Sequence, residues 1–207
     1  KKSRSGDSIR TIRFLRRGTG RSLPSVGNPS EKGMLTDPIV FRTAVQRAAV
    51  LSLHTSPLAQ PGSGDSGGMN VYVRELVSGL AQAGVDCTTY TRMTDPTTPT
   101  VIQVEPGHRV VHVPAGPFDL DKADLGQILQ PFGDAVLDLI KNDFPADVLH
   151  ANYWLSGVVG HRLKHELGLP LVTTFHTLGM VKAEGGDPEP ERRHRAEREI
   201  IGCSDAI

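Results

Sequence analysis

Several features that would assign this 207-residue sequence to a protein class are missing from it. It has two cysteines, Cys87 and Cys203, which form no CxxC pair, so we expect two structural thiols in a reducing compartment. No apolar run approaches the roughly 20 residues needed to span a bilayer. Basic and acidic residues balance at 23 each, so the net charge does not indicate a nucleic-acid or membrane partner. We therefore expect a cytoplasmic protein without a membrane span.

Familiar catalytic and nucleotide-binding motifs are also missing. There is no GxxxxGK[ST] sequence, which excludes a P-loop, and no Ser/His/Asp set or carboxylate pair that would indicate a hydrolase. The dinucleotide fingerprint fails too, because the second expected strand ends in Thr91-Arg92 without the acidic residue that holds a ribose. His161 and His165 have helical spacing, but Arg162 stands where a zincin has glutamate, so a solvated helix face is the better interpretation.

The N-terminal region differs in composition from the rest of the chain. Residues 1–21 carry eight basic residues and one acid, Asp7, and the apolar residues around Phe14 are interrupted by arginines. A secretory signal needs an uninterrupted apolar core of roughly 7–15 residues, which this segment lacks. We predict a disordered basic extension over residues 1–44; a transit peptide remains an alternative interpretation.

After this N-terminal region, the sequence begins to show the apolar patterns of strands and helices. Residues 48–53 form a short apolar run typical of a buried strand, and a loop rich in proline, glycine and serine follows over 55–67. Apolar residues then recur at helical spacing from Met69, and Gly84 is placed to end that helix as its C-terminal cap. With a strand expected at 86–91, this is a βαβ unit, the opening of a doubly wound parallel sheet.

The alternation of strands and helices continues to the end of the sequence. Further strands are expected at 109–113, 147–150 and 171–175, and helices at 125–141, 155–167 and 192–201. Asp205, Ala206 and Ile207 begin another strand, after which we expect more elements to follow. Residues 45–207 are therefore predicted to form one α/β domain with a Rossmann-like, doubly wound parallel sheet.

Histidines stand at three of the expected strand ends. They are His54, His150 and His176, and the last is followed by Thr177. Ligands of open parallel sheets bind at the carboxyl ends of the strands. Three histidines at that one edge are hard to explain by packing, so we interpret the set as a marker of a functional site.

A glycine-rich segment leads into the first helix. In residues 62–70 the glycines would let the backbone approach a ligand closely, and the helix that follows presents unpaired N–H groups at its positive end. The segment therefore predicts an anion or phosphate site. The alternative is that the glycines only form the turn that precedes the helix.

At these same residues the chain resembles a known family. The run from His54 to Asn70, HTSPLAQPGSGDSGGMN, is similar to the opening motif of the D-inositol-3-phosphate glycosyltransferases, which act in the first step of mycothiol synthesis. The resemblance covers Arg47 to the C-terminus. It continues in Ala115–Pro117 with Lys122, His150–Gly157, Thr174–Leu178 with Lys182, and Pro188–Pro190 with Arg193 and Glu197.

The resemblance implies a fold and an activity. The family has two facing Rossmann-like domains, the B-type glycosyltransferase fold, of which this chain would be the N-terminal, acceptor-binding half. Its members are retaining enzymes that move N-acetylglucosamine from UDP-N-acetylglucosamine to 1D-myo-inositol 3-phosphate. The sugar nucleotide and the inositol phosphate are then the expected partners. A second copy of the chain, in a homodimer, is a further possible partner. No cofactor is expected in this half, and Mg²⁺, where required, would be held by the second domain.

The resemblance also implies a set of site residues. The acceptor would be bound by His54, Asp65, Ser66, Gly67, Gly68, Met69, Asn70, Lys122, Tyr153, Thr177 and Arg193. The donor would contact Gln60, Pro61 and Gly68, and His176 would lie beside the reacting sugar carbon. Three alternatives remain: a related glycosyltransferase with another acceptor (sucrose-phosphate-synthase-like or lipid-directed), an NADP-dependent oxidoreductase that uses Arg92, and a non-catalytic binding domain.

Overall fold

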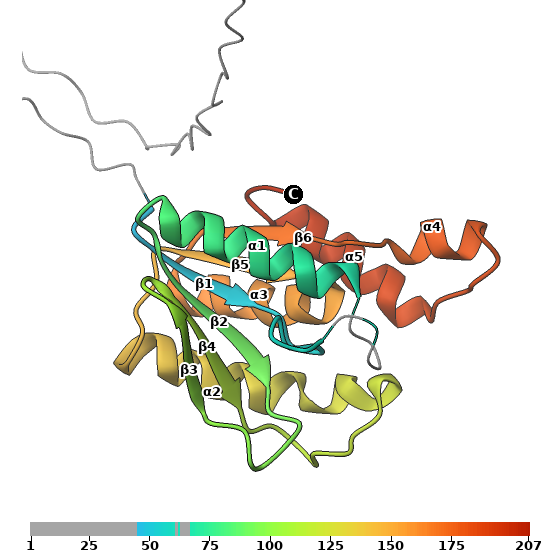
Figure 1. Cartoon of the computed structure of the whole chain (residues 1–207). Coiled ribbons are helices and arrows are strands. Elements are labelled where there is room, and N and C mark those ends of the chain that lie inside the picture. The colour runs from blue at the N-terminus through green and yellow to red at the C-terminus, as the bar shows by residue number, and fades with distance from the viewer. Residues whose placement is uncertain (1–44, 61, 63–66) are drawn as a thin grey trace, which may run out of the picture. The chain divides into compact units, whose positions relative to one another are not determined.

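The computed structural model of the chain describes residues 45–60, 62 and 67–207 (Figure 1). The strands are β1 Arg47–Leu51, β2 Asp86–Arg92, β3 Val101–Glu105, β4 His108–Val113, β5 Val148–Asn152 and β6 Leu171–Thr174. The helices are α1 Gly68–Gln82, the 3₁₀ helix η1 Lys122–Ile128, α2 Leu129–Asn142, α3 Trp154–Leu167, α4 Gly179–Glu184 and α5 Glu191–Cys203. The extension predicted for residues 1–44 lies outside the described residues.

Six strands form a single sheet in the order β3-β4-β2-β1-β5-β6. All neighbours pair in parallel except β3, which is antiparallel to β4 at the edge. The chain winds outward from β1 through β2 to β4 on one side, and through β5 to β6 on the other. The predicted doubly wound parallel sheet is thus confirmed, with one antiparallel edge strand that the sequence pattern did not indicate.

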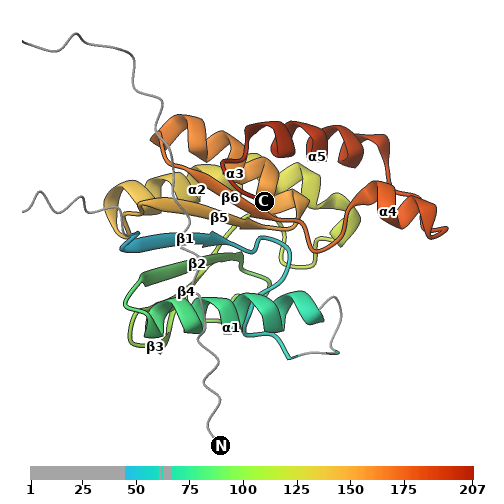
Figure 2. The ribbon, with the colours of Figure 1, turned by 90° about the horizontal axis from the view of Figure 1, so that it is seen from above.

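The sheet is covered on both faces (Figure 2). In β1, Ala49 and Leu51 belong to a large apolar core shared with α2 and α3, whereas Ala48 and Val50 pack with Val73 of α1 on the opposite face. Successive side chains of a strand point to opposite faces, so a central strand covered on both sides must be apolar throughout. This explains why residues 48–51 read as an unbroken apolar run. Among the described residues, no helix combines the length and apolarity that a bilayer crossing requires.

Helix α5 lies against α3, and glycines allow the close approach. A Cβ added to Gly157 of α3 would come within 2.8 Å of Ile200 Cδ1 in α5. A Cβ on Gly160, one turn later, would meet Leu171 Cδ1 of β6 at 2.9 Å. Real Cβ atoms do not come this close to their neighbours, so the absence of side chains at these two positions permits the packing of α3 between α5 and the sheet.

Several predicted boundaries are confirmed, and others are wrong. Gly84 has φ +91 and follows the end of α1, as a C-terminal glycine should. The helix expected over 125–141 begins instead as η1 and becomes α-helical only at Leu129. The strand expected at 147–150 runs on to Asn152, so His150 lies inside β5 and not beyond its end. The strand expected at 205–207 is reduced to one parallel bridge, between Ala206 and Val172.

Candidate functional site

The candidate site lies where the winding direction of the sheet reverses. β1 and β5 are neighbours, and the chain leaves them toward opposite sides of the sheet, which makes their carboxyl ends the topological switch point. His54 follows β1 and Tyr153 follows β5, and their ring centroids are 4.5 Å apart. Ligands of open α/β sheets bind in the crevice outside such a point. Two of the predicted acceptor residues are therefore brought together at the expected position.

Two residues at this edge hold backbone conformations that non-glycine residues avoid. Tyr153 has φ 74 and ψ 156, and His176, which follows β6, has φ 60. The Tyr153 N–H donates to the Thr174 carbonyl at 2.8 Å, and the Thr177 N–H donates to the Phe175 carbonyl at 2.7 Å, so hydrogen bonds hold both turns. Each such conformation costs about 1–3 kcal/mol and is typically found at functional sites.

Two cations lie near the ring of Tyr153. The guanidinium carbon of Arg193, in α5, is 5.0 Å from the ring centroid, and Lys122 Nζ, at the start of η1, is 6.0 Å from it. Arg193 also donates to the Tyr153 hydroxyl at 3.2 Å. These three side chains come from segments far apart in the sequence. A cluster of two cations, a hydroxyl and an imidazole at one sheet edge is suited to an anionic ligand.

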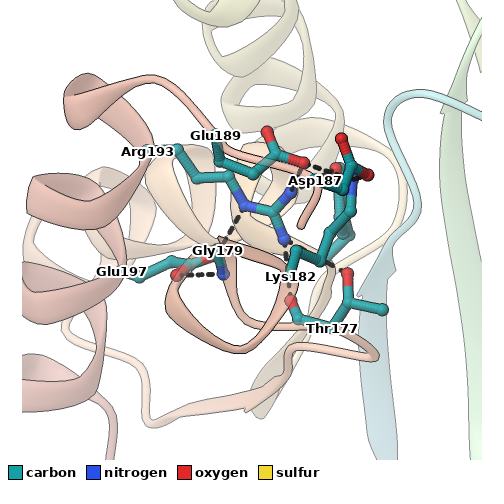
Figure 3. Close-up of polar contacts among 8 residues, drawn as sticks. Thr177, Gly179, Lys182, Asp187, Glu189, Arg193 and Glu197 are labelled. Carbon is teal, nitrogen blue, oxygen red and sulfur yellow. Dashed lines mark hydrogen bonds and ion pairs between the residues drawn. The ribbon is translucent and has the colours of Figure 1, made fainter. Parts of the chain in front are cut away.

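Arg193 is fully buried and its polar contacts are extensive (Figure 3). Its NH2 donates to Thr177, at 2.8 Å to the carbonyl and 3.2 Å to Oγ1. Its Nε donates to Glu197 at 2.7 Å, and NH1 lies 2.7 Å from Glu189 Oε1. Burial acts to lower the pKa of Arg193, but the hydrogen bond and charge of Glu197, with the charges around it, outweigh burial and raise that pKa. Arg193 is thus a permanent cation, and each of its three nitrogens has a partner.

The segment between β6 and α5 is fixed to the same network. Glu197 accepts hydrogen bonds from the Gly179 N–H, at 2.9 Å to Oε2, which ties the start of α4 to α5 (Figure 3). Glu189 accepts a hydrogen bond from Lys182 as well as from Arg193, and Lys182 also pairs with Asp187 at 2.7 Å. Hydrogen bonds to Asp187 and Glu189 raise the pKa of Lys182, so it remains charged. The carboxylate of Glu189 is therefore shared by two cations.

His176 lies beside this cluster in a different electrostatic environment. Its Nε2 is 3.0 Å from Asn152 Oδ1, and its ring lies edge to face with Tyr72 of α1, at 5.0 Å between centroids. Burial lowers the pKa of His176, so the imidazole is neutral near pH 7. It can exchange hydrogen bonds with a ligand without adding charge. Among the described residues, the Asn152 Nδ2 is buried without a hydrogen-bond partner.

Tyr72 lies beside the candidate site and was not predicted from the sequence. Its ring is 42% exposed and stands one turn beyond Gly68 on α1. The available signal was an aromatic residue on the first turns of a helix that follows a glycine-rich loop. Its position beside His176 adds an aromatic surface to the site, next to the predicted donor contacts.

The glycine-rich segment divides into residues that support the fold and residues that face open space. Asn70 is buried, and its Nδ2 donates to Thr55 Oγ1 at 2.7 Å, while Met69 packs against the core under α1. The side chains of Met69 and Asn70 are therefore used within the protein. Gly67 and Gly68 differ, because a Cβ added to either would meet no atom of the described residues within 4 Å. Gln60 is exposed, and the predicted positions Pro61, Asp65 and Ser66 lie outside the described residues.

A cleft of about 580 Å³ opens beside the cluster, and its walls include His54, Phe118 and Lys122. Arg92 also lines it, but the guanidinium donates to the Ala115 carbonyl at 3.1 Å and to the Pro117 carbonyl. Arg92 therefore holds the loop that leads to Lys122.

His150 does not join the site. It lies within β5, where its Nε2 is 3.0 Å from Thr174 Oγ1. Burial, with a smaller effect from His176, lowers the pKa of His150 to about 4. The interpretation of three histidines at three strand ends is thus wrong for this one, since β5 ends two residues later than the sequence pattern indicated. His150 is a neutral histidine of the sheet.

The sheet order and the helices on both faces define a Rossmann-like domain, with a candidate site at its switch point. Residues 67–207 match the family described as the glycosyl transferase 4-like domain, which is about two thirds of the sequence. The chain belongs to that family.

Proteins of known name agree with this assignment. The chain is 47% identical, over 168 residues, to a D-inositol 3-phosphate glycosyltransferase from Xylanimonas cellulosilytica, and 46% identical, over 169 residues, to one from Rhodococcus erythropolis. Each alignment covers 78% of this chain, but only 40% and 38% of the two relatives. Among solved structures, a sucrose-phosphate synthase from Thermosynechococcus elongatus superposes with a TM-score of 0.74 at 34% identity, covering 78% of this chain and 42% of that one. The chain thus spans about two fifths of the length of these proteins.

Proposed function

We propose that this chain is the acceptor-binding half of a retaining glycosyltransferase that moves N-acetylglucosamine from UDP-N-acetylglucosamine to 1D-myo-inositol 3-phosphate. The names of the curated relatives support the choice of acceptor. The chain's length relative to these proteins supports a second, donor-binding domain. A cytoplasmic location belongs to the same proposal and is supported by the two free cysteines.

The observation that carries the proposal is the convergence of phosphate-binding groups on Tyr153. Arg193 and Lys122 lie 5.0 and 6.0 Å from its ring centroid, and the Thr177 hydroxyl contacts the same guanidinium. A phosphate monoester carries up to two negative charges and is bound by charged and hydroxyl donors of this kind. The inositol ring would then lie toward His54, whose ring packs against Tyr153 at a tilt of 40°.

The donor sugar would occupy the neighbouring space. Gly68 supports this placement, since no atom of the residues that the structure describes lies within 4 Å of a Cβ built on it. The N-terminus of α1 presents N–H groups to an anion. Gln60 and Pro61 would complete the contact from this domain. The neutral imidazole of His176 would hydrogen-bond the sugar beside its reacting carbon. In a retaining transfer the leaving diphosphate can itself take the proton of the acceptor hydroxyl, so this half needs no general base. Any Mg²⁺ would bind through the second domain.

A glycosyltransferase with a different phosphorylated acceptor is the second candidate. The 34% identity and the TM-score of 0.74 with a sucrose-phosphate synthase favour it, because they show that the same fold occurs in an enzyme of a different name. The NADP-dependent oxidoreductase is disfavoured by the contacts of Arg92. The guanidinium is used to hold the loop at Ala115 and Pro117, and the chain belongs to a glycosyl transferase family.

A titration of the 207-residue chain separates these possibilities. Calorimetry with inositol 3-phosphate, unphosphorylated inositol and a hexose phosphate compares the contributions of the ring and the phosphate. We expect saturable binding of inositol 3-phosphate, tighter by at least tenfold than that of either other compound. Equal binding of the hexose phosphate would support the second candidate. Binding of NADP in preference to all three, or sugar transfer by this chain alone, would contradict the proposal of a two-domain glycosyltransferase.

A further inference from the structure

Three metal-ligating side chains outside the candidate site lie together on the surface formed by α3 and α5. They are His161 and His165 of α3 and Cys203, the last residue of α5. The ligand atoms of all three lie within 4.8 Å of one another. We propose that these residues form a zinc site that joins α3 to α5.

The helix places the two histidines side by side. Residues four apart lie on the same face of an α-helix, and the ring centroids of His161 and His165 are 5.2 Å apart. Cys203 reaches this pair from the other helix, with Sγ 3.3 Å from His165 Nε2. Because Arg162 replaces the glutamate of the zincin motif, the pair is not the catalytic centre of a zincin protease. The thiol, which only the tertiary structure brings near, supplies a third ligand of a different kind.

The backbone around the cluster is already fixed by other contacts. Lys164, which lies between the two histidines in sequence, donates to the carbonyl of Cys203 at 2.7 Å and pairs with Asp205 at 2.5 Å. Asp205 in turn accepts the N–H of Leu171 in β6 at 2.8 Å. The C-terminal end of α5 is therefore held against α3 and the sheet, so a metal would not have to bring the two helices together.

The ligand set selects the metal. Two imidazole nitrogens and one thiolate suit Zn²⁺, with bonds of about 2.0–2.1 Å to nitrogen and about 2.3 Å to sulfur, and they are poor ligands for Mg²⁺ or Ca²⁺. Around one tetrahedral zinc ion these bond lengths place the ligand atoms roughly 3.4–3.6 Å apart. The sulfur of Cys203 and the Nε2 of His165 are 3.3 Å apart, close to that spacing, and no ligand atom of the three is more than 4.8 Å from another, so small side-chain rotations would complete the set. Water would take the fourth position.

Zinc at this position would stabilise the half of the domain that carries the Arg193 network. Helix α5 begins at Glu191, bears Arg193 near its start, and would be clamped at its other end through Cys203. Binding to the folded chain raises its stability by mass action, so the thermal midpoint should rise with the zinc concentration. This role is independent of which sugar or acceptor the protein uses.

The test measures metal binding by the 207-residue chain after treatment with a chelator. We expect one Zn²⁺ per chain by calorimetry, a rise in the thermal midpoint with Zn²⁺ and none with Mg²⁺, and, with Co²⁺ as the probe, the thiolate-to-cobalt absorption of a sulfur-ligated ion. Cys203→Ser and His161→Gln should each weaken zinc binding beyond the roughly 10–100-fold that loss of an outer-shell partner costs.

The matched control is His194→Gln, which removes another histidine of α5, outside the cluster, and should bind zinc like the wild type. Far-UV circular dichroism of each variant without metal checks that the fold is kept. The proposal is overturned if the wild-type chain binds no stoichiometric zinc. It is equally overturned if Cys203→Ser binds zinc as tightly as the wild type, since the thiolate would then not be a ligand.

Discussion

The carboxylate of Glu189 lies 2.7 Å from the guanidinium of Arg193, measured between Oε1 and NH1, and also accepts a hydrogen bond from Lys182. The other carboxylate on Arg193, that of Glu197, is more deeply buried, with 5% of its side chain exposed against 17% for Glu189. A phosphate can therefore reach Arg193 most easily by displacing Glu189. The negative charge of Glu189 would then act as an internal competitor of the acceptor phosphate.

The substitution Glu189→Gln tests this relationship. A neutral amide competes less well than a carboxylate for a guanidinium, by about 1 kcal/mol, so inositol 3-phosphate should bind the 207-residue chain roughly fivefold more tightly. Calorimetry measures the change. Glu191→Gln is the control, because its carboxylate pairs with Arg198 and should leave the affinity unchanged. Weaker binding by Glu189→Gln would show that Glu189 positions Arg193 and does not compete with the ligand.

Lys122 should contribute directly to acceptor binding. A charge-assisted contact with phosphate is worth about 1.5–3 kcal/mol, so Lys122→Ala should weaken the binding of inositol 3-phosphate by roughly one to two orders of magnitude. Lys141→Ala, a change of an exposed lysine in the last turn of α2, should have no effect. Titration of both variants at the same ionic strength makes the comparison. Equal affinities for the two variants would place Lys122 outside the acceptor site.

Gly68 should be needed for ligand binding but not for folding. It has no positive φ, and an added Cβ would meet no atom within 4 Å in the described part of the chain, so Gly68→Ala should fold with an unchanged or slightly higher thermal midpoint. A ligand lying against this backbone would meet the new methyl group, and its binding should be lost. Gly79→Ala in the same helix should gain roughly 0.5–1 kcal/mol of stability and bind normally.

The measurements for Gly68→Ala are the thermal midpoint and the affinity for inositol 3-phosphate and for UDP-N-acetylglucosamine. A variant that is destabilised yet binds both ligands normally would mean that the glycine serves the turn before α1. In that case the ligand does not lie against the start of the helix.

His150 should make the domain less stable in acid. Its pKa of about 4 in the folded chain is below the value of about 6.5 expected after unfolding, because burial disfavours the charged form. The unfolded chain therefore binds a proton more readily as the pH falls below about 6.5, and stability declines until about pH 4. For this residue alone the loss is about 2 kcal/mol at pH 5.

The variant His150→Gln removes this proton uptake. Urea unfolding at pH 7 and pH 5 should show a smaller decline for the variant than for the wild type, whatever the change in stability at pH 7. Other buried histidines with lowered pKa values, such as His108 and His112, contribute equally to both proteins. Identical declines for the two proteins would contradict the assignment of a neutral, partly buried His150.

The sequence by itself determined the elements whose signals are local. The apolar run of β1, the helical spacing of α1 and Gly84 at its end follow from neighbouring residues, and the structure confirms each of them. The motif from His54 to Asn70 also predicted that the candidate site lies at the carboxyl edge of the sheet, because parallel strands bring their carboxyl ends together.

Tertiary structure decided the features that depend on distant partners. Strand β3 lies at the edge of the sheet and is only partly buried, so it needs no apolar run. Its residues therefore did not predict that it pairs with β4. Hydrogen bonding with the neighbouring strands β1 and β6 sets the length of β5, and His150 therefore lies within this strand. In both cases the backbone pairing, and not the local pattern, determines the structure.

The chemistry of individual side chains was likewise decided in three dimensions. The sequence could name Arg193 as a cation, but not its burial between Glu189 and Glu197 or its contact with Tyr153. It could show His161 and His165 on one helix face, but not the thiol of Cys203 beside them. The sequence fixes the type of each side chain. Its charge environment and its ligand partners depend on which segments the folded sheet and helices bring within hydrogen-bonding distance.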